Sequence, residues 1–172
     1  NGVLTAAIDE HGPAEVRLIA NKAWTLGDRS TTFHGRDVFA PVGAHLARGD
    51  PFEEVGPVVE GWVRLDLPRA KRDGDALVGE VTTLDLPWGN VWTNIPAALL
   101  DELAPVGATL QVTVGDQTVT APRVATFGDV PEGKPLVYVN SRGDASVALN
   151  MGDFAGAHHV TRGLPVTLRA VR

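Results

Sequence analysis

The stretch TLQVTVGDQTVTAPR, from Thr109 to Arg123, carries the clearest fold signal of this 172-residue chain. Threonine and valine, which favour strands, stand on both sides of a Gly115-Asp116 pair that suits a tight turn. We therefore expect an antiparallel hairpin with strands at Thr109–Val114 and Gln117–Arg123. The chain on both sides of this hairpin repeats the same kind of pattern.

Short segments rich in β-branched residues, separated by turn residues, recur through residues 59–172. They are Trp62–Leu67, Ala76–Leu84, Asn90–Ile95, Leu136–Asn140, Ala145–Leu149 and Pro165–Val171. Many short strands at close spacing predict a small antiparallel barrel or sandwich. One helix, predicted from Pro96 to Leu103 with the proline at its first position, interrupts the series.

Residues 1–55 have a different character, with one predicted strand and two predicted helices. We expect a helix at Leu4–Glu10, an apolar strand at Glu15–Ala20 and a second helix that Asp37 caps. The run Arg48-Gly49-Asp50-Pro51 is typical of the end of that second helix. One strand cannot complete an α/β layer, and an unpaired edge promotes aggregation, so we expect further polypeptide to cover it.

Composition excludes several classes of protein. The net charge is −6 and there is no basic stripe, so nucleic acid is not an expected partner. No apolar run reaches the length of a membrane span, and we expect a cytoplasmic protein without membrane association. The absence of cysteine excludes disulfides and thiolate chemistry. The adjacent His158 and His159 lack metal-site spacing, and we expect no metal.

The run from Thr31 to Pro41, TTFHGRDVFAP, places a histidine where a helix is predicted to begin. Near the positive end of a helix dipole, His34 would favour its neutral, proton-accepting form. Pro41 falls in the first turn, where backbone N–H groups lack partners, and does not break the helix. The alternative is a loop histidine that only bonds backbone.

Two further polar turns follow predicted strands. In the first, Asp85, Trp88 and Asn90 surround a Pro/Gly turn, a set that suits a cationic, aromatic ligand. The alternative is a core tryptophan with turn-forming Asp and Asn. In the second, Arg142 could clamp a carboxylate with Ser141 beside it, although an exposed turn arginine explains the same pattern.

Taken together, these runs resemble the S-adenosyl-L-methionine (SAM) hydroxide adenosyltransferase family, which is related to fluorinase and chlorinase. The resemblance covers nearly the whole chain. The motifs that carry it are Asn1-Gly2-Val3-Leu4-Thr5, Thr32-Phe33-His34-Gly35-Arg36-Asp37, Asp85-Leu86-Pro87-Trp88-Gly89-Asn90-Val91-Trp92-Thr93-Asn94-Ile95 and Asn140-Ser141-Arg142-Gly143.

The resemblance implies an N-terminal α/β domain, here residues 1–58, and a C-terminal antiparallel β-barrel, residues 59–172. It also implies a homotrimer in which SAM lies between one subunit's N-terminal domain and a neighbour's barrel. The implied reaction is cleavage of SAM at C5′ by water or hydroxide, giving adenosine and L-methionine, with SAM as substrate and no cofactor.

By the same matching, His34 and Gly35 are the implied catalytic positions, where fluorinase has tyrosine and serine, and Phe33 is a substrate contact. Asp85, Ser141 and Arg142 are implied to hold the methionine amine and carboxylate. The implied adenine contacts are Trp88, Asn90 and Phe127, with backbone groups near Asn150 and Met151; taken alone, Phe127 reads as a loop anchor.

One departure from the family is large. Family members have a substantial segment before the Asn-Gly-Val-Leu-Thr motif, with the ribose-binding aspartate and the Asp and Arg partners of the histidine. We therefore expect a separate N-terminal segment to complete the enzyme. Two alternatives stay open: a SAM-dependent, chlorinase-like halogenase giving 5′-halo-5′-deoxyadenosine, and a non-catalytic SAM- or adenosine-binding module.

Overall fold

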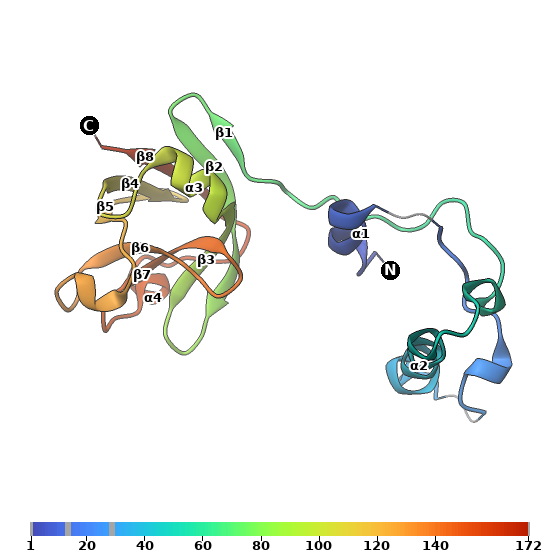
Figure 1. Cartoon of the computed structure of the whole chain (residues 1–172). Helices are drawn as coiled ribbons and strands as arrows, with labels where there is room; N and C mark the ends of the chain where they lie inside the picture. Colours follow the sequence, from blue (N-terminus) through green and yellow to red (C-terminus); the bar gives the residue numbers. More distant parts are fainter. Residues whose placement is uncertain (1, 13–14, 28–29, 172) are drawn as a thin grey trace. The chain divides into compact units, whose positions relative to one another are not determined.

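The computed structural model describes residues 2–12, 15–27 and 30–171. The chain divides into two compact units, Asn1–Leu67 and Pro68–Arg172 (Figure 1). The division falls later than the boundary we placed after residue 58, because the next segment bonds to the first unit. The Val59 N–H donates to the Val16 carbonyl at 2.9 Å, and the Leu65 N–H donates to the Thr5 hydroxyl at 3.0 Å.

The second unit is an eight-stranded antiparallel sheet that curls into a nearly closed barrel (Figure 1). Neighbouring strands follow the order β5-β4-β8-β2-β3-β7-β6, and β1 pairs with β2. A parallel bridge between Arg123 and Val137 joins the end of β5 to β6 and brings the two edges together. The strands are β1 (Lys71–Asp73), β2 (Ala76–Asp85), β3 (Asn90–Pro96), β4 (Thr109–Val114), β5 (Gln117–Pro122), β6 (Pro135–Val139), β7 (Asp144–Leu149) and β8 (Pro165–Ala170).

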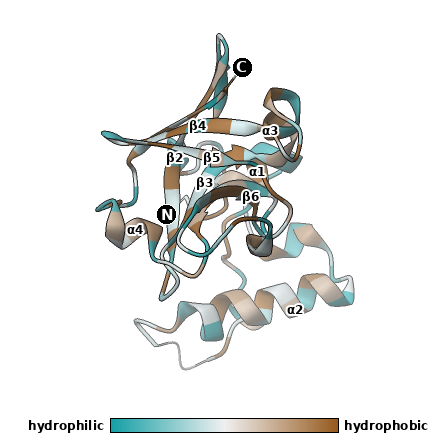
Figure 2. Ribbon diagram, turned by 90° about the vertical axis from the view of Figure 1, so that its left-hand side faces the viewer, coloured by the Kyte–Doolittle hydropathy of each residue, from teal (hydrophilic) through white to brown (hydrophobic). Residues whose placement is uncertain are grey.

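The predicted hairpin is confirmed, with Val114 opposite Gln117 at its tight end. Along β4, the buried Leu110, Val112 and Val114 alternate with more exposed residues, so one face of the strand enters the core. The hydrophobic colour of β2 and β4 in Figure 2 reflects this core. It continues through the fully buried Leu168 on β8.

Helices and short turns complete the barrel unit. The predicted helix is confirmed as α3 (Ala97–Leu103), but Pro96 is its N-cap and not its first residue. A 3₁₀ turn at Phe127–Asp129 and the short helix α4 (Phe154–Ala157) escaped prediction. The strand predicted at Trp62–Leu67 is wrong, because that segment is irregular, and the exposed β1 was not foreseen.

The first unit contains α1 (Thr5–His11), a π-helical turn at Gly35–Phe39 that leads into α2 (Ala40–Arg48), and 3₁₀ turns at Lys22–Trp24 and Phe52–Val55. The predicted first helix is confirmed. Figure 2 shows teal and brown alternating along α2, the pattern of a helix with one buried face. Gly49, in the left-handed region at φ +96°, ends α2 as predicted.

Two local predictions in this unit are wrong. Residues 15–20 form no strand, because the segment makes one bridge, Arg17 to Val58, and only scattered backbone bonds. Asp37 is not an N-cap, since the helical turn already begins after His34. Pro41 has no N–H for the Asp37 carbonyl, and this carbonyl accepts from the Leu26 N–H at 2.9 Å instead. No helix in the described ranges is long and apolar enough to cross a membrane.

Candidate functional site

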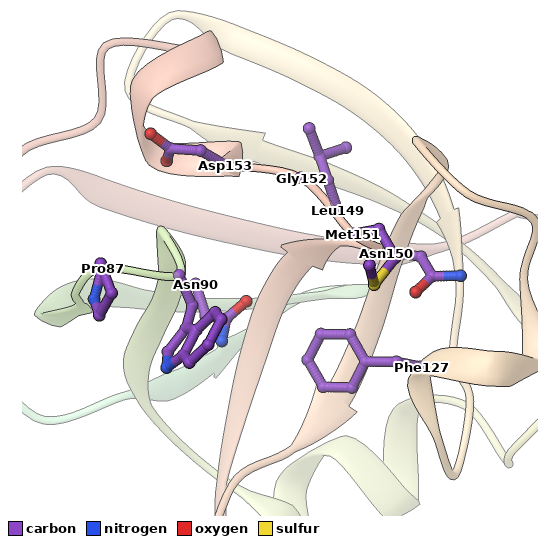
Figure 3. A pocket seen from close by; sticks show the side chains of 9 residues that line it. Pro87, Asn90, Phe127, Leu149, Asn150, Met151, Gly152 and Asp153 are labelled. Atoms are coloured by element: carbon purple, nitrogen blue, oxygen red, sulfur yellow. The ribbon is translucent and has the colours of Figure 1, made fainter.

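A pocket of about 410 Å³ opens on the barrel beside the β2–β3 turn (Figure 3). It gathers five of the residues that the sequence singled out, from three separate segments: Trp88, Asn90, Phe127, Asn150 and Met151. Its other lining residues are Pro87, Leu149, Gly152 and Asp153. The pocket therefore combines aromatic faces with amide groups.

The turn between β2 and β3 forms the wall that carries Trp88. The Gly89 N–H donates to the Asp85 carbonyl at 2.9 Å, and the Leu86–Pro87 peptide is cis. Gly89 has a φ of +72°, and a Cβ there would lie 1.8 Å from Asp153 Oδ1, so the position accepts only glycine. This close docking holds the turn in place and leaves the Trp88 ring exposed at its tip.

Asp85 and Asn90 face each other across the base of the same turn. Asn90 is only 7% exposed, and its Nδ2 donates to Asp85 Oδ2 at 2.9 Å. This bond fixes which way the amide points. The Asn90 Oδ1 and the second amide hydrogen can then serve a ligand that offers both a donor and an acceptor, as an adenine edge does.

The opposite wall is formed by Phe127, Asn150 and Met151 (Figure 3). Phe127 begins a 3₁₀ turn closed by a capping box, in which the Thr126 N–H donates to Asp129 Oδ2 at 2.8 Å. The Asn150 N–H donates to the Lys134 carbonyl, and its carbonyl accepts from the Gly133 N–H. The next residue, Met151, has a φ of +55°, which turns the chain sharply at this wall.

A second turn, Asn140 to Asp144, carries the predicted carboxylate-binding residues. The Asn140 Oδ1 accepts from the N–H groups of Arg142 at 2.8 Å and Asp144 at 3.2 Å, which fixes the turn. Ser141 is exposed, and the Arg142 guanidinium lies 5.0 Å from the centre of the Trp92 ring. Burial raises the pKa of Asp144, and the charge of Arg142 opposes that rise.

Sequence reasoning missed several residues that belong to this region. Trp92, Ser146 and Tyr138 occupy facing positions on β3, β7 and β6. Trp92 follows Asn90 by two positions on β3 and so points to the same face, a signal that the period of a strand could have supplied. Asp153 caps α4 by accepting from the Gly156 N–H at 2.7 Å. An Asp before a short helical run is an N-cap signal that the sequence also contained.

The other predicted site residues, Phe33, His34 and Gly35, belong to the first compact unit. Phe33 and His34 are exposed, and a Cβ at Gly35 would meet nothing within 4 Å. The loop before them is well anchored. The Ser30 hydroxyl accepts from the N–H groups of Thr32 at 3.1 Å and Phe33 at 3.3 Å.

The Asp37 carboxylate, which is buried at 1% exposure, anchors this loop. It accepts from Arg36 and, at 2.7 Å, from the Ser30 N–H. These bonds, chiefly the one from Arg36, lower the pKa of Asp37 from 3.8 to about 2. The Arg36 guanidinium also lies 5.0 Å from the centre of the Phe33 ring. The segment that presents His34 is therefore ordered by a charged anchor.

The structure thus brings the barrel residues together around one pocket and its neighbouring polar turn. His34 and Gly35 stand at the start of a helical segment, as the sequence indicated. The binding and catalytic roles assigned to all of these residues stay predictions.

Comparison with known proteins places these features in one family. The sequence model of the SAM hydroxide adenosyltransferase C-terminal domain matches residues 79–167, and that of the N-terminal domain matches residues 1–56. The chain is 40% identical over 166 residues to an (R)-S-adenosyl-L-methionine hydrolase of Salinispora tropica, covering 95% of this chain and 60% of the relative. It is 36% identical over 175 residues to a fluorinase of an Actinoplanes species, covering 98% of this chain and 58% of the relative.

Solved structures agree. A crystal structure of an uncharacterized conserved protein from Thermotoga maritima superposes with a TM-score of 0.89 at 37% identity. The match covers 98% of this chain and 65% of the other. The chain spans about 60% of the length of the curated relatives that it matches.

Proposed function

The chain belongs to the SAM hydroxide adenosyltransferase family, and we propose that it forms part of an enzyme that cleaves SAM at C5′ with water or hydroxide. The products are adenosine and L-methionine. The relatives named as SAM hydrolase support this reading. Because the chain spans about 60% of those relatives' length, the activity is proposed for the protein with the remaining family segment present.

The observation that carries the proposal is the barrel pocket with its adjoining carboxylate. Trp88 and Phe127 offer aromatic faces for an adenine ring, and Asn90 offers an amide for its edge. Asp85 lies within hydrogen-bonding distance of Asn90, so a negative charge adjoins the adenine site. This charge, with the exposed Ser141 and Arg142, suits the zwitterionic amino-acid end of SAM.

The protein need not protonate the leaving group, because the sulfonium departs as a neutral thioether. An oxygen–carbon bond forms at C5′ while the carbon–sulfur bond breaks, and its electron pair passes to sulfur. The nucleophilic water loses one proton, for which we propose His34 as acceptor or orienting group, a contribution of typically ~10²–10⁴-fold. The open space around Gly35 leaves room for the nucleophile. We propose no cofactor for this displacement.

A halide nucleophile is the second candidate, and one observation favours it. Fluorinases are among the relatives, at 36% identity, and a large anion also fits the space beside Gly35. The product would then be 5′-halo-5′-deoxyadenosine. The two reactions share a substrate and a leaving group, so only the product separates them.

Product analysis tests the proposal. The protein, as its organism produces it, is incubated with SAM, with and without chloride or fluoride, and the products are identified by mass spectrometry. We expect adenosine and methionine in every case. A halogenated nucleoside would establish the second candidate, and tight SAM binding without any turnover would establish a binding module.

Substitution of the histidine tests its role. His34→Ala is expected to lower kcat for adenosine formation by about 10²-fold or more and to leave the affinity for SAM nearly unchanged. His11→Ala removes another exposed histidine of the same unit and is the matched control. An undiminished kcat in His34→Ala would remove this residue from the mechanism.

Assembly and location belong to the same proposal. We propose a cytoplasmic homotrimer with its sites at subunit interfaces. Mass spectrometry of the intact protein under native conditions measures the number of copies. A monomer that hydrolyses SAM would contradict this part of the proposal.

A further inference from the structure

Three side chains form a row across the sheet next to the pocket. Trp92 on β3 lies opposite Ser146 on β7, and Ser146 lies opposite Tyr138 on β6. Facing residues of neighbouring strands project to the same side, so two large aromatic residues flank one small serine. Ser146 is fully buried between them. The row adjoins the pocket, since the Tyr138 and Phe127 rings are 4.9 Å apart between centres.

One polar atom of this row lacks a partner. The Trp92 Nε1 is buried, and no acceptor among the described residues meets it in hydrogen-bonding geometry. Leaving such a donor unsatisfied is costly, and native proteins keep few of them. The Tyr138 side chain lies on the same face of the sheet, one strand beyond Ser146. Burial raises the pKa of Tyr138, and the approach of Trp92 and Ser146 opposes that rise.

The remaining hydrogen bonds show which atoms of the row are donors. The Asn140 Oδ1 is occupied by two backbone N–H groups, so its Nδ2 is the donor of the 2.9 Å bond to Ser146 Oγ. Ser146 then has its own proton to donate toward Tyr138, and Trp92 Nε1 can only donate. Trp92 Nε1 and the Ser146 hydroxyl are thus donors on the same face of the sheet as the Tyr138 hydroxyl. A Tyr138 oxygen that accepts from them leaves its own O–H for a group outside the row.

We propose that Tyr138 is a substrate-selecting residue, whose hydroxyl donates to the carboxylate at the amino-acid end of the substrate and is oriented for this by Trp92 and Ser146. This inference rests on the proposed function. Arg142, whose guanidinium lies over the Trp92 ring, supplies the positive charge for the same carboxylate, while Asp85 receives the ammonium group. The protein therefore selects SAM over its decarboxylated analogue.

The charge of Asp85 favours the protonated form of this hydroxyl. Asp85 raises the pKa of Tyr138 further, in the same direction as burial. A neutral phenol donates to a carboxylate, whereas a phenolate would repel it. The acidic residue proposed to receive the ammonium group thus acts in the same direction as burial on the proposed donor to the carboxylate.

Two unreactive ligands separate this inference from the proposed function. S-Adenosyl-L-homocysteine carries the amino-acid end, and 5′-methylthioadenosine lacks it. With the protein as its organism produces it, calorimetry measures both affinities in Tyr138→Phe, which keeps the ring and removes the hydroxyl. We expect about tenfold or more weaker binding of the first ligand and no change for the second.

Companion variants define the role of the other members. Trp92→Phe keeps an aromatic ring under Arg142 but removes the N–H, and a smaller loss confined to the same ligand is expected. Thr118→Val removes an exposed hydroxyl at the turn end of the β4–β5 hairpin, where it bonds Thr113, and is the matched control. It should bind both ligands as the parent protein does.

The outcomes are distinct. Equal loss of both ligands in Tyr138→Phe, or loss of neither, would overturn the selecting role, while the proposed function stands if the parent protein binds both ligands. Failure of the parent protein to bind either ligand would instead overturn the proposed function. Steady-state kinetics adds one check. The KM ratio of decarboxylated SAM to SAM should fall in Tyr138→Phe, with kcat for SAM changed little.

A spectroscopic measurement keeps the inference testable without turnover. Tyr138 is the single tyrosine of these 172 residues, and the difference between the alkaline absorbance titrations of the parent protein and of Tyr138→Phe reports its ionisation. Asp85→Asn should lower the pKa of Tyr138, because a neighbouring negative charge is removed. Bound S-adenosyl-L-homocysteine should raise this pKa more than bound 5′-methylthioadenosine does. An identical titration with both ligands would contradict a contact between the hydroxyl and the carboxylate.

Discussion

The barrel and the first unit differ in how their residues are held. Among the described residues, the barrel core is a continuous cluster that includes Leu77, Leu110, Leu168 and Phe154, each at most 1% exposed. The first unit has a small cluster, Trp24, Val42 and Val55, with two partly buried residues packed against it. Burial of apolar area is the main stabilising contribution in folding, so the barrel holds most of it.

The first unit relies on polar contacts instead. Arg17 donates to the Gly56 carbonyl at 2.7 Å, Asn21 donates to the Glu54 carbonyl at 3.0 Å, and His45 stacks on Trp24. At the same time it leaves apolar residues exposed around a groove of about 510 Å³. These include Val3, Leu4, Phe39 and Val63. The proposed binding residues other than Phe33 thus stand on the densely packed unit, and the proposed catalytic histidine stands on the thinly packed one.

Truncation of a core leucine should give the largest difference between the units. Leu168→Ala is expected to cost about 2–5 kcal/mol of unfolding free energy, because Leu168 is fully buried on a central strand. Leu46→Ala removes the same atoms from the partly buried edge of the first unit's cluster and is expected to cost about 1–2 kcal/mol. Urea unfolding, with amide hydrogen exchange to assign each unit, measures both. Equal costs would show that the units are equally well packed.

A glycine substitution tests whether the tight packing of the barrel extends to the site. Gly89→Ala places a Cβ against Asp153, and we expect it to cost about 1–3 kcal/mol beyond the backbone strain. Gly107→Ala is the control, because its φ is also positive, at +92°, but a Cβ there meets nothing within 4 Å. It should show only the backbone cost of roughly 1–2 kcal/mol. A difference near zero would mean that the turn adjusts freely.

Acid should affect the first unit before the barrel, and this is the smallest expected effect. The pKa of Asp37 is lowered to about 2 in the folded protein, from a reference value of 3.8. The carboxylate therefore stabilises the fold above about pH 4, and this contribution is lost as the pH falls toward 2. Hydrogen exchange of residues 30–37 should accelerate over that range. Asp37→Asn should already show the faster exchange at neutral pH, and an unchanged rate would exclude the carboxylate as the anchor.

Local sequence determined those elements whose signals are complete within a few residues. The hairpin at residues 109–123 needs only its turn pair and its alternation, and Gly49 ends its helix through its own backbone freedom. By contrast, Glu15–Ala20 has the composition of a strand but no regular neighbour to pair with. The exposed β1 has no apolar pattern and exists through its pairing with β2.

The site also contains some residues that local motifs indicated and others that depend on the tertiary structure. The motifs around Trp88, Phe127 and Met151 indicated residues that the fold does gather around one pocket. The row of Trp92, Ser146 and Tyr138 depends on the register of three strands, which no local pattern specifies. Similarly, Asp37 has the residue type of an N-cap but lies within the helical turn. Its carboxylate accepts from the Ser30 N–H, and its carbonyl, for which Pro41 has no N–H, accepts from the Leu26 N–H.

The sequence by itself determined the barrel class, the family and the polar turns that present the candidate residues, because turn chemistry and strand alternation act over short distances. Only the tertiary structure decided which side chains meet. A contact such as Gly89 against Asp153, or Trp92 opposite Ser146, joins residues far apart in the chain. Such contacts follow from the register and closure of the whole sheet, which are set by the joint burial of its core.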